Sequence, residues 1–451
     1  MSGLFGTDGV RGVANADLTP ELVFRIGRAG AAVLAGDGDR HRPIVVGRDT
    51  RLSGSMLEAA IVAGITSVGR DVVSLGVVPT PAVACVTRRE GAAAGVMISA
   101  SHNPIADNGV KFFGSDGFKL SDEIENEIEQ RIEATDLARP TAEGVGVARV
   151  AQNLTRHYYA ELYESQADLG GLHVVVDAAY GAAFAIAPYV LRKLGATVTE
   201  LHCESDGSRI NVACGSTDLA PLQAEVRRLR DATSEHVVGV AFDGDADRAL
   251  FVDETEAVVT GDHVMFAIGT DMHARGELAR GAIVGTVMSN IGFERALRAH
   301  GIALVRAPVG DRYVLQRLRE GGYTLGGEQS GHIIDLRRNT TGDGPMTAMT
   351  LLGIVAAKRA TLTELVAEVV PAPQILVNVP AGRIDVLERS GVRAAIAAGE
   401  TALGSSGRLY VRPSGTEPVI RVMVEGDDGR VIKQVAARVA AEIEEEIARL
   451  T

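Results

Sequence analysis

Residues 44–75 read IVVGRDTRLSGSMLEAAIVAGITSVGRDVVSL, and this stretch decides the fold. The β-branched run 44–46 predicts a strand, residues 53–68 predict a helix of about four turns, and 72–75 predict a second strand. Strand-helix-strand units of this kind build parallel sheets through right-handed crossovers. The same plan recurs at 173–201 and 282–305, so the sequence predicts three similar α/β domains.

After Pro371 the pattern changes to short strands, expected at 375–379 and 419–424, and a closing amphipathic helix. We therefore expect an α/β protein with three similar α/β domains whose mixed sheets are mainly parallel, followed by a C-terminal α+β domain, with the active site in the central cleft. The expected domains are 1–152, 153–255, 256–370 and 371–451.

Composition and charge exclude several classes of protein. The chain has 451 residues, 46% hydrophobic and 23% charged, which suits a soluble protein with several cores. Its net charge of −13 disfavours binding to nucleic acid or an anionic membrane. No apolar stretch approaches the roughly 20 residues that span a bilayer. Asp8 and Arg11 interrupt any signal-peptide core, so we expect an untargeted chain.

The cysteine pattern indicates a reducing compartment. Cys85, Cys203 and Cys214 are odd in number, far apart and in no Cys-x-x-Cys spacing. We expect a cytoplasmic protein.

The first candidate catalytic group is Ser101, in the run 97–104 that reads MISASHNP. A serine between a buried strand and an Asn-Pro turn presents its hydroxyl at a sheet edge, where it can act as a nucleophile. Ser and Asn also start ordinary turns, so this octapeptide alone leaves the structural alternative open.

Lys111 is a second candidate, because the chain contains only five lysines beside 40 arginines. A lysine amine can give up its proton when its pKa is lowered, whereas a guanidinium cannot. Lys111 is therefore a candidate proton carrier, although chance also explains its position.

The third candidate is an acidic loop, 243–248, which reads DGDADR after the apolar run 237–242. Three alternating carboxylates at a strand end suit Mg²⁺, which prefers oxygen ligands. An EF-hand is disfavoured because Arg248 stands where that loop needs glycine. In a second alternative Asp243 is the nucleophile of an aspartyl-phosphate phosphatase.

Two further loops carry polar groups between glycines and turn residues. Residues 326–332, GGEQSGH, place a carboxylate, a hydroxyl and an imidazole where they can bind sugar hydroxyls or an amine. Residues 411–418, VRPSGTEP, with Arg421 beyond them, combine arginine, hydroxyls and backbone amides as a phosphate site does. Taken alone, each is also a common turn.

Together these loops resemble the four signature loops of the α-D-phosphohexomutase superfamily, over the whole chain. The matching segments are, in order, 100–104, 243–248, 327–332 and 412–416. Within the superfamily, residues 5–12 and Gln329 are similar to the bacterial branch that acts on hexosamine phosphates. The branches acting on mannose or glucose phosphate more often carry Met in that loop. Tyr180 departs from the pattern, where we expect Asn.

The resemblance implies a phosphoserine enzyme with one Mg²⁺ per active site, working through a sugar bisphosphate. Ser101 would carry the covalent phosphate and bind Mg²⁺ together with Asp243, Asp245 and Asp247.

The remaining roles are also implied by the resemblance. Arg11 and Arg248 would balance the charge of the transferring phosphoryl group, and Lys111 and His332 would act as acid and base. His102 would orient the nucleophile. The expected substrate-binding residues are Glu328 and Ser330 for sugar hydroxyls, and Arg412, Ser414, Gly415, Thr416 and Arg421 for the phosphate that does not react.

The expected partner is a small hexosamine phosphate, without nucleic acid or membrane, and a homodimer is expected because members of the superfamily are often dimers. The same chemistry on mannose or glucose phosphate and a non-catalytic sugar-phosphate sensor remain as alternatives.

Overall fold

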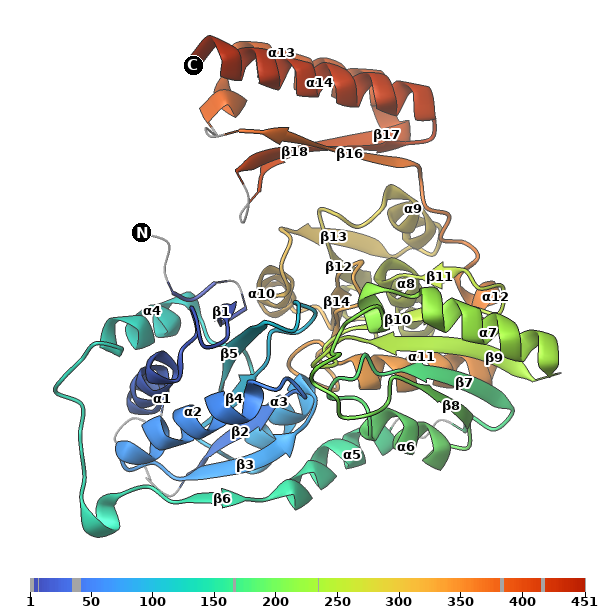
Figure 1. The fold of residues 1–451 in the computed structure, drawn as a ribbon. Helices are drawn as coiled ribbons and strands as arrows, with labels where there is room; N and C mark the ends of the chain where they lie inside the picture. The colour runs from blue at the N-terminus through green and yellow to red at the C-terminus, as the bar shows by residue number, and fades with distance from the viewer. Residues whose placement is uncertain are drawn as a thin grey trace. The chain divides into compact units, whose positions relative to one another are not determined.

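The computed structural model describes residues 4–6, 8–34, 42–164, 168–233, 235–381, 385–414 and 418–450. The chain divides into two compact units (Figure 1). The first contains residues 1–286 and 305–367, and the second contains 287–304 and 368–451. No helix within the described ranges is long and apolar enough to cross a bilayer.

The first sheet of the larger unit has six strands in the order β1-β5-β4-β2-β3-β6. Strands β2, β3, β4 and β6 are parallel, and β5 runs antiparallel to both β4 and β1. The strands are β1 (Val10–Val13), β2 (Ile44–Arg48), β3 (Val72–Val77), β4 (Ala94–Ile98), β5 (Asp107–Gly114) and β6 (Ala148–Val150). The helices are α1 (Pro20–Leu34), α2 (Gly54–Ser67), α3 (Thr80–Arg89) and α4 (Asp122–Arg131).

Helices cover both faces of this sheet because its strands are apolar on both faces. Ile44 and Val46 join the core formed with α1 and α2. Gly47 faces α3, where an added Cβ would lie 2.6 Å from Val83. Glycine also lets α1 and α2 approach closely, since a Cβ on Gly64 would lie 2.2 Å from a backbone oxygen.

The second sheet has five strands in the order β11-β10-β9-β7-β8. β7 is parallel to β8 and β9, while β10 runs antiparallel to β9 and β11. The strands are β7 (Leu172–Asp177), β8 (Thr197–Leu201), β9 (His236–Phe242), β10 (Ala249–Val252) and β11 (Val258–Val259). The helices are α5 (Arg156–Tyr163), α6 (Ile186–Lys193) and α7 (Ala220–Ala232).

The third sheet has the order β13-β12-β14-β15, with β12 parallel to β14 and β15 antiparallel to β14. The strands are β12 (Ala282–Thr286), β13 (Ala303–Ala307), β14 (Leu325–Gly327) and β15 (Ile333–Asp335). The helices are α8 (Gly261–Ala274), α10 (Asp311–Gly321), α11 (Gly344–Lys358) and α12 (Leu362–Val366). Helix α9 (Ile291–Ala299), between β12 and β13 in the sequence, belongs to the second unit.

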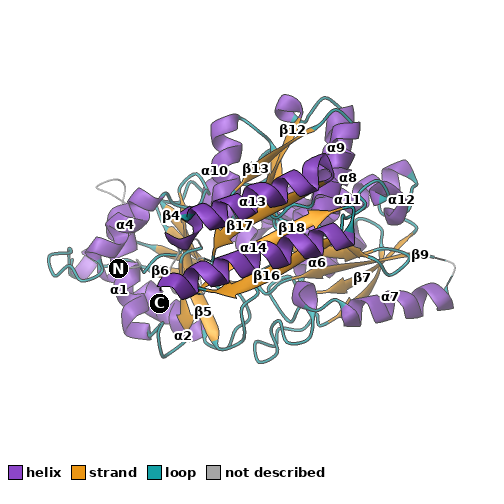
Figure 2. Cartoon of the chain, turned by 90° about the horizontal axis from the view of Figure 1, so that it is seen from above, coloured by secondary structure: helices purple, strands orange, loops and turns teal. Residues whose placement is uncertain are grey.

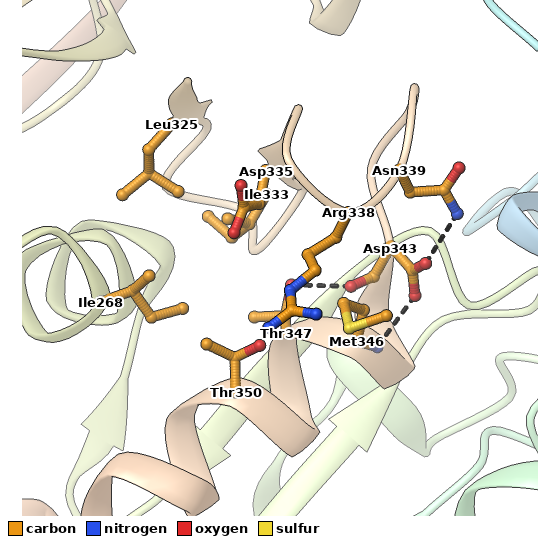
Figure 3. Close-up of a pocket in the computed structure, with 10 residues that line it drawn as sticks. All are labelled: Ile268, Leu325, Ile333, Asp335, Arg338, Asn339, Asp343, Met346, Thr347 and Thr350. Carbon is orange, nitrogen blue, oxygen red and sulfur yellow. Dashed lines mark hydrogen bonds between the residues drawn. The ribbon is translucent and has the colours of Figure 1, made fainter. Parts of the chain in front are cut away.

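A cavity of about 10 Å³ lies beside β14, β15 and α11 (Figure 3). That volume holds about one water molecule, so it leaves no room for a substrate. The Asp343 carboxylate there accepts hydrogen bonds from Met346 N (2.9 Å) and Asn339 Nδ2 (2.9 Å), which caps α11.

The second unit contains a three-stranded antiparallel sheet, β16-β18-β17, with two helices on one face (Figures 1 and 2). The apolar side of the predicted amphipathic helix, α14 (Gly429–Leu450), packs against the sheet, with Ile432, Val439 and Ile443 buried. The elements are β16 (Gln374–Pro380), β17 (Gly407–Pro413), β18 (Val419–Gly426), α13 (Ser390–Leu403) and α14 (Gly429–Leu450).

The expected fold class is confirmed, with three differences in detail. The second crossover helix, α6, has 8 residues, about two turns instead of four, because left-handed Ala179 and Tyr180 first turn the chain toward the acidic loop. The expected loop 411–418 begins in a strand, since 411–413 belong to β17. Strand β17 and helix α13 were not expected. Tyr180 holds a left-handed φ of 53°, which Asn adopts more readily.

Candidate active site

Ser101 lies in the turn after β4 and points at the acidic loop. Its side chain is buried, and its Oγ donates to Asp243 Oδ2 at 2.6 Å. Ser101 N donates to Ser99 Oγ, which in turn donates to Asp49 Oδ2, so buried polar groups hold both sides of the residue. The turn is real, and it aims the hydroxyl at a carboxylate.

Asp243, Asp245 and Asp247 follow β9, and all three are buried. One carboxylate oxygen from each lies within 4.8 Å of the others, a spacing that can hold a metal ion. Asp245 Oδ1 and Asp247 Oδ1 are buried without a hydrogen-bond partner. Burial and repulsion from the other two carboxylates raise the pKa of Asp243 well above its usual value. Unpaired oxygens and mutual repulsion both fit a divalent cation with hard oxygen ligands.

Lys111, on β5, is buried against the same carboxylates. Its Nζ lies 2.9 Å from Asp245 Oδ2 and 3.4 Å from Asp247 Oδ2. Burial alone would lower the pKa of Lys111, but Asp245, Asp8 and Asp247 hold it well above the usual value. The sequence suggested a lowered pKa; here the pKa is raised, because the three carboxylates outweigh burial and the nearby Arg11.

Lys111 belongs to a closed ring of six side chains with alternating charge. Its members come from elements far apart in the sequence: Asp8, Lys119, Asp311, His332, Asp247 and Lys111. Lys119 pairs with both Asp8 and Asp311. His332 lies 3.5 Å from Asp311 and 3.6 Å from Asp247, and Lys111 closes the ring at 3.1 Å from Asp8.

The ring determines the charge of His332. Burial alone would lower the pKa of His332, but Asp247 and Asp311 raise it above the usual value. The two carboxylates thus favour the protonated form of His332.

The two expected arginines and His102 surround Ser101. Arg11, on β1, donates to Asn103 Oδ1 at 3.3 Å and pairs with Asp8. Arg248 lies 3.9 Å from Asp247. Burial, Arg248 and Arg11 lower the pKa of His102 to about 4, so this imidazole is neutral at pH 7. His102 Nδ1 lies 3.3 Å from Ser101 Oγ, which fits an orienting contact.

The third loop is the hairpin turn between β14 and β15. Glu328 and Ser330 are both half-buried there. Glu328 Oε1 accepts a hydrogen bond from Gly310 N at 3.0 Å, which fixes the carboxylate. A Cβ on Gly331 would lie 2.4 Å from the Ala249 oxygen, so glycine brings this turn against β10, next to the acidic loop.

The fourth loop joins β17 to β18 in the second unit. Arg412 and Arg421 are paired across these strands, and Ser414 N donates to the Val419 oxygen at 2.8 Å. Gly415 and Thr416 lie outside the described residues.

Several residues at the site had no role in the sequence analysis. Thr80, at the start of α3, donates from Oγ1 to Asp245 Oδ2 at 2.6 Å. Asp8, Lys119 and Asp311 belong to the charge ring. Lys119 carried a signal as the second of two lysines soon after Ser101, and Asp8 lies in the segment 5–12 of the family resemblance.

Models of one protein family match nearly the whole chain. The four domain models of phosphoglucomutase/phosphomannomutase match residues 2–139 (domain I), 154–256 (domain II), 260–372 (domain III) and 375–442 (C-terminal domain). The chain belongs to the phosphoglucomutase/phosphomannomutase family, and by reaction class it is an isomerase of the phosphomutase type.

Within this family, the chain is similar over nearly its full length to phosphoglucosamine mutases. Phosphoglucosamine mutase of Moorella thermoacetica is 52% identical over 441 residues, covering 97% of this chain and 98% of the relative. That of Azorhizobium caulinodans is 50% identical, covering 96% and 97%.

Solved structures show the same fold. A phosphoglucomutase/phosphomannomutase family protein from Burkholderia thailandensis has a TM-score of 0.82 at 25% identity, covering 99% of this chain and 98% of that one. N-acetylphosphoglucosamine mutase of Aspergillus fumigatus, solved with GlcNAc-6P and magnesium, has a TM-score of 0.66 at 18% identity, covering 98% and 96%.

Proposed function

We propose that this chain interconverts glucosamine 6-phosphate and glucosamine 1-phosphate, feeding the synthesis of amino-sugar nucleotides such as UDP-N-acetylglucosamine. The observation that carries the proposal is the 2.6 Å contact between Ser101 Oγ and Asp243 in a cluster of three buried carboxylates. Relatives about half identical over their full length support the substrate, since they are phosphoglucosamine mutases.

The reaction begins with a phosphoryl group on Ser101 Oγ. The sugar's C1 hydroxyl attacks that phosphorus, its proton passes to a base, the bond to Oγ breaks, and Oγ takes a proton from an acid. This gives a 1,6-bisphosphate and a free serine. The bisphosphate then reorients in the site. Ser101 Oγ gives up its proton and attacks the 6-phosphorus, the bond from phosphorus to the sugar O6 breaks, and O6 takes a proton, which releases glucosamine 1-phosphate and restores the phosphoserine.

Asp243, Asp245 and Asp247 would hold one Mg²⁺ together with an oxygen of Ser101. When bound, the ion would neutralise charge on the transferring phosphoryl group. Magnesium in the Aspergillus fumigatus structure supports this assignment.

The other residues bind the sugar phosphate and move protons. Arg11 and Arg248 offset the phosphoryl charge, and His102 orients Ser101. Lys111 and His332 exchange the protons; the carboxylates around them raise the pKa of both groups.

Substrate binding is divided between the two remaining loops. Glu328 and Ser330 bind sugar hydroxyls. The phosphate that does not react is held by Arg412, Ser414, Gly415, Thr416 and Arg421.

We also propose the four-domain division at 152, 255 and 370, a cytoplasmic location, and a homodimer. The family matches to domains I, II, III and the C-terminal domain support the number of domains.

A coupled assay with the 6-phosphates of glucosamine, mannose and glucose tests the substrate. We expect the highest kcat/KM for glucosamine 6-phosphate. A higher kcat/KM for mannose or glucose 6-phosphate would contradict the proposed substrate and indicate a phosphomannomutase or phosphoglucomutase.

Peptide mapping of the intact, phosphorylated protein tests the mechanism. The phosphate should be on Ser101, and Ser101→Ala should still bind the sugar phosphate but have no turnover. Phosphate on Asp243 with steady release of inorganic phosphate would instead indicate a phosphatase. A wild-type protein that binds the sugar phosphate but never turns it over would be a sensor.

A further inference from the structure

The backbone of Ser101 is in an unfavourable conformation. Its φ is +52°, in the left-handed region that side-chain-bearing residues seldom adopt. A serine remains there only when its surroundings hold it. Two side chains that have no part in the proposed mechanism donate hydrogen bonds to carbonyl oxygens of this turn.

The first is Arg51, just after β2. Its side chain is fully buried, and its Nε lies 3.0 Å from Asp49 Oδ2. The guanidinium donates to backbone oxygens around the turn: Nη2 to Ser101 (2.9 Å) and Asn103 (2.8 Å), and Nη1 to Asp107 (2.9 Å) and Pro104. One planar group thus gathers four carbonyls of a single loop.

The second is Asn211, from the loop after β8. Its Nδ2 donates to the Ser101 oxygen at 2.9 Å and to the Asn103 oxygen at 3.3 Å. Its own backbone is left-handed, with φ +60°, and its N–H donates to the Ala179 oxygen at 3.1 Å. The Ser101 carbonyl therefore accepts from Arg51, which follows a strand of the first sheet, and from Asn211, which follows a strand of the second.

We infer that Arg51 and Asn211 are positioning residues that lock the phosphoserine turn, and so fix the direction of Ser101 Oγ toward Asp243. This inference rests on the proposed function of Ser101. The two donors fix the Ser101 carbonyl, so the peptide unit cannot rotate out of the left-handed conformation without losing both hydrogen bonds. Because phosphoryl transfer depends on alignment, a looser turn slows turnover more than it weakens substrate binding.

A lysine cannot replace Arg51 in this role. The guanidinium presents five N–H groups in a fixed plane, whereas an ammonium has three donors at one point. Arg51→Lys keeps the charge beside Asp49 but loses most of the contacts with the loop.

Asn211→Gly is the central test, because glycine adopts φ +60° without strain and removes only the amide. Ala213→Gly is the matched control: Ala213 has φ +51°, lies in the same loop and is exposed. We expect kcat of Asn211→Gly to fall about tenfold with KM within about twofold, because misalignment affects the reacting geometry. The kcat of Arg51→Lys should fall further, because this variant loses more of the contacts with the turn.

Hydrogen exchange by mass spectrometry tests the lock without relying on turnover. In Asn211→Gly, amides of residues 101–107 should exchange faster than in wild type and in Ala213→Gly, with the melting temperature and exchange elsewhere unchanged. Equal kcat and equal exchange in the two glycine variants would overturn the inference, and so would a loss of protection spread over the whole protein.

The outcomes also separate this inference from the proposed function. Absence of mutase turnover in the wild type would refute the proposed function, and loop exchange would then decide whether the lock exists. If Arg51→Lys fails to fold, Asn211→Gly alone decides.

Discussion

At the scale of single residues, the site depends on which oxygen of each carboxylate is left free. Asp245 Oδ2 is occupied by the Thr80 hydroxyl and the Lys111 amine, while Oδ1 is buried without a partner. Groups behind a metal ligand orient it and tune its affinity. Thr80 therefore decides which Asp245 oxygen is available to a cation.

Thr80→Val tests this orientation, since valine matches the shape of threonine without its hydroxyl. We expect the Kd for Mg²⁺, or for Mn²⁺ as a spectroscopic probe, to rise about tenfold or more. The measurement is a metal titration of the protein without substrate, so it does not depend on activity.

The control is Thr87→Val in the same helix. Thr87 is also buried, but its hydroxyl donates to the Val83 oxygen at 2.7 Å and makes no hydrogen bond to an acidic side chain among the described residues. An equal change in both variants would show that Thr80 affects only the stability of α3.

At the scale of elements, short side chains join segments that the sequence separates. Asn290, which begins α9, accepts from Gly292 N at 2.8 Å and from Ala372 N at 2.9 Å, and donates to the Ala372 oxygen at 3.1 Å. One buried amide thus caps a helix and fixes the segment leading to β16. The second unit consequently includes α9 although α9 precedes β16 by many residues.

We predict that Asn290→Ala lowers the free energy of unfolding by about 1–3 kcal/mol, because it removes a cap and leaves buried amides unsatisfied. Urea titration measures the change. Asn153→Ala, at an exposed position, should stay within about 0.5 kcal/mol of wild type. If the two variants lose equal stability, Asn290 does not join these segments.

At the scale of the whole molecule, a chain with net charge −13 places three of its buried carboxylates within 4.8 Å of one another. Lys111 offsets only part of that repulsion, since burial and the other two carboxylates still raise the pKa of Asp243 well above its usual value. A cation that binds the folded protein and not the unfolded chain adds stability that grows with its concentration.

We therefore predict that Mg²⁺ raises the unfolding temperature and that a chelator reverses the effect. At a concentration 100 times Kd the gain should be about 2.7 kcal/mol. The comparison is with NaCl of equal ionic strength, which screens charge without occupying the site. Asp245→Asn should lose most of the Mg²⁺ response; an unchanged response in that variant would place the cation elsewhere.

The sequence by itself determined the repeating α/β plan, the C-terminal α+β domain and the loops that carry the chemistry. These features are local: the strand-helix-strand pattern of 44–75 and the acidic run 243–248 are set by neighbouring residues. The family resemblance follows from the same short motifs, which is why the enzyme class could be predicted without a structure.

Only the tertiary structure decided which side chains surround those loops. Lys119 and Asp311 are 192 residues apart, and Arg51 and Ser101 are 50 apart, yet each pair is in contact. No local pattern records such pairs, because they form between loops that lie far apart in the sequence and meet only in the folded chain. The charge state of Lys111 is the clearest case: the sequence shows one rare lysine, whereas its pKa depends on three carboxylates that folding brings to it.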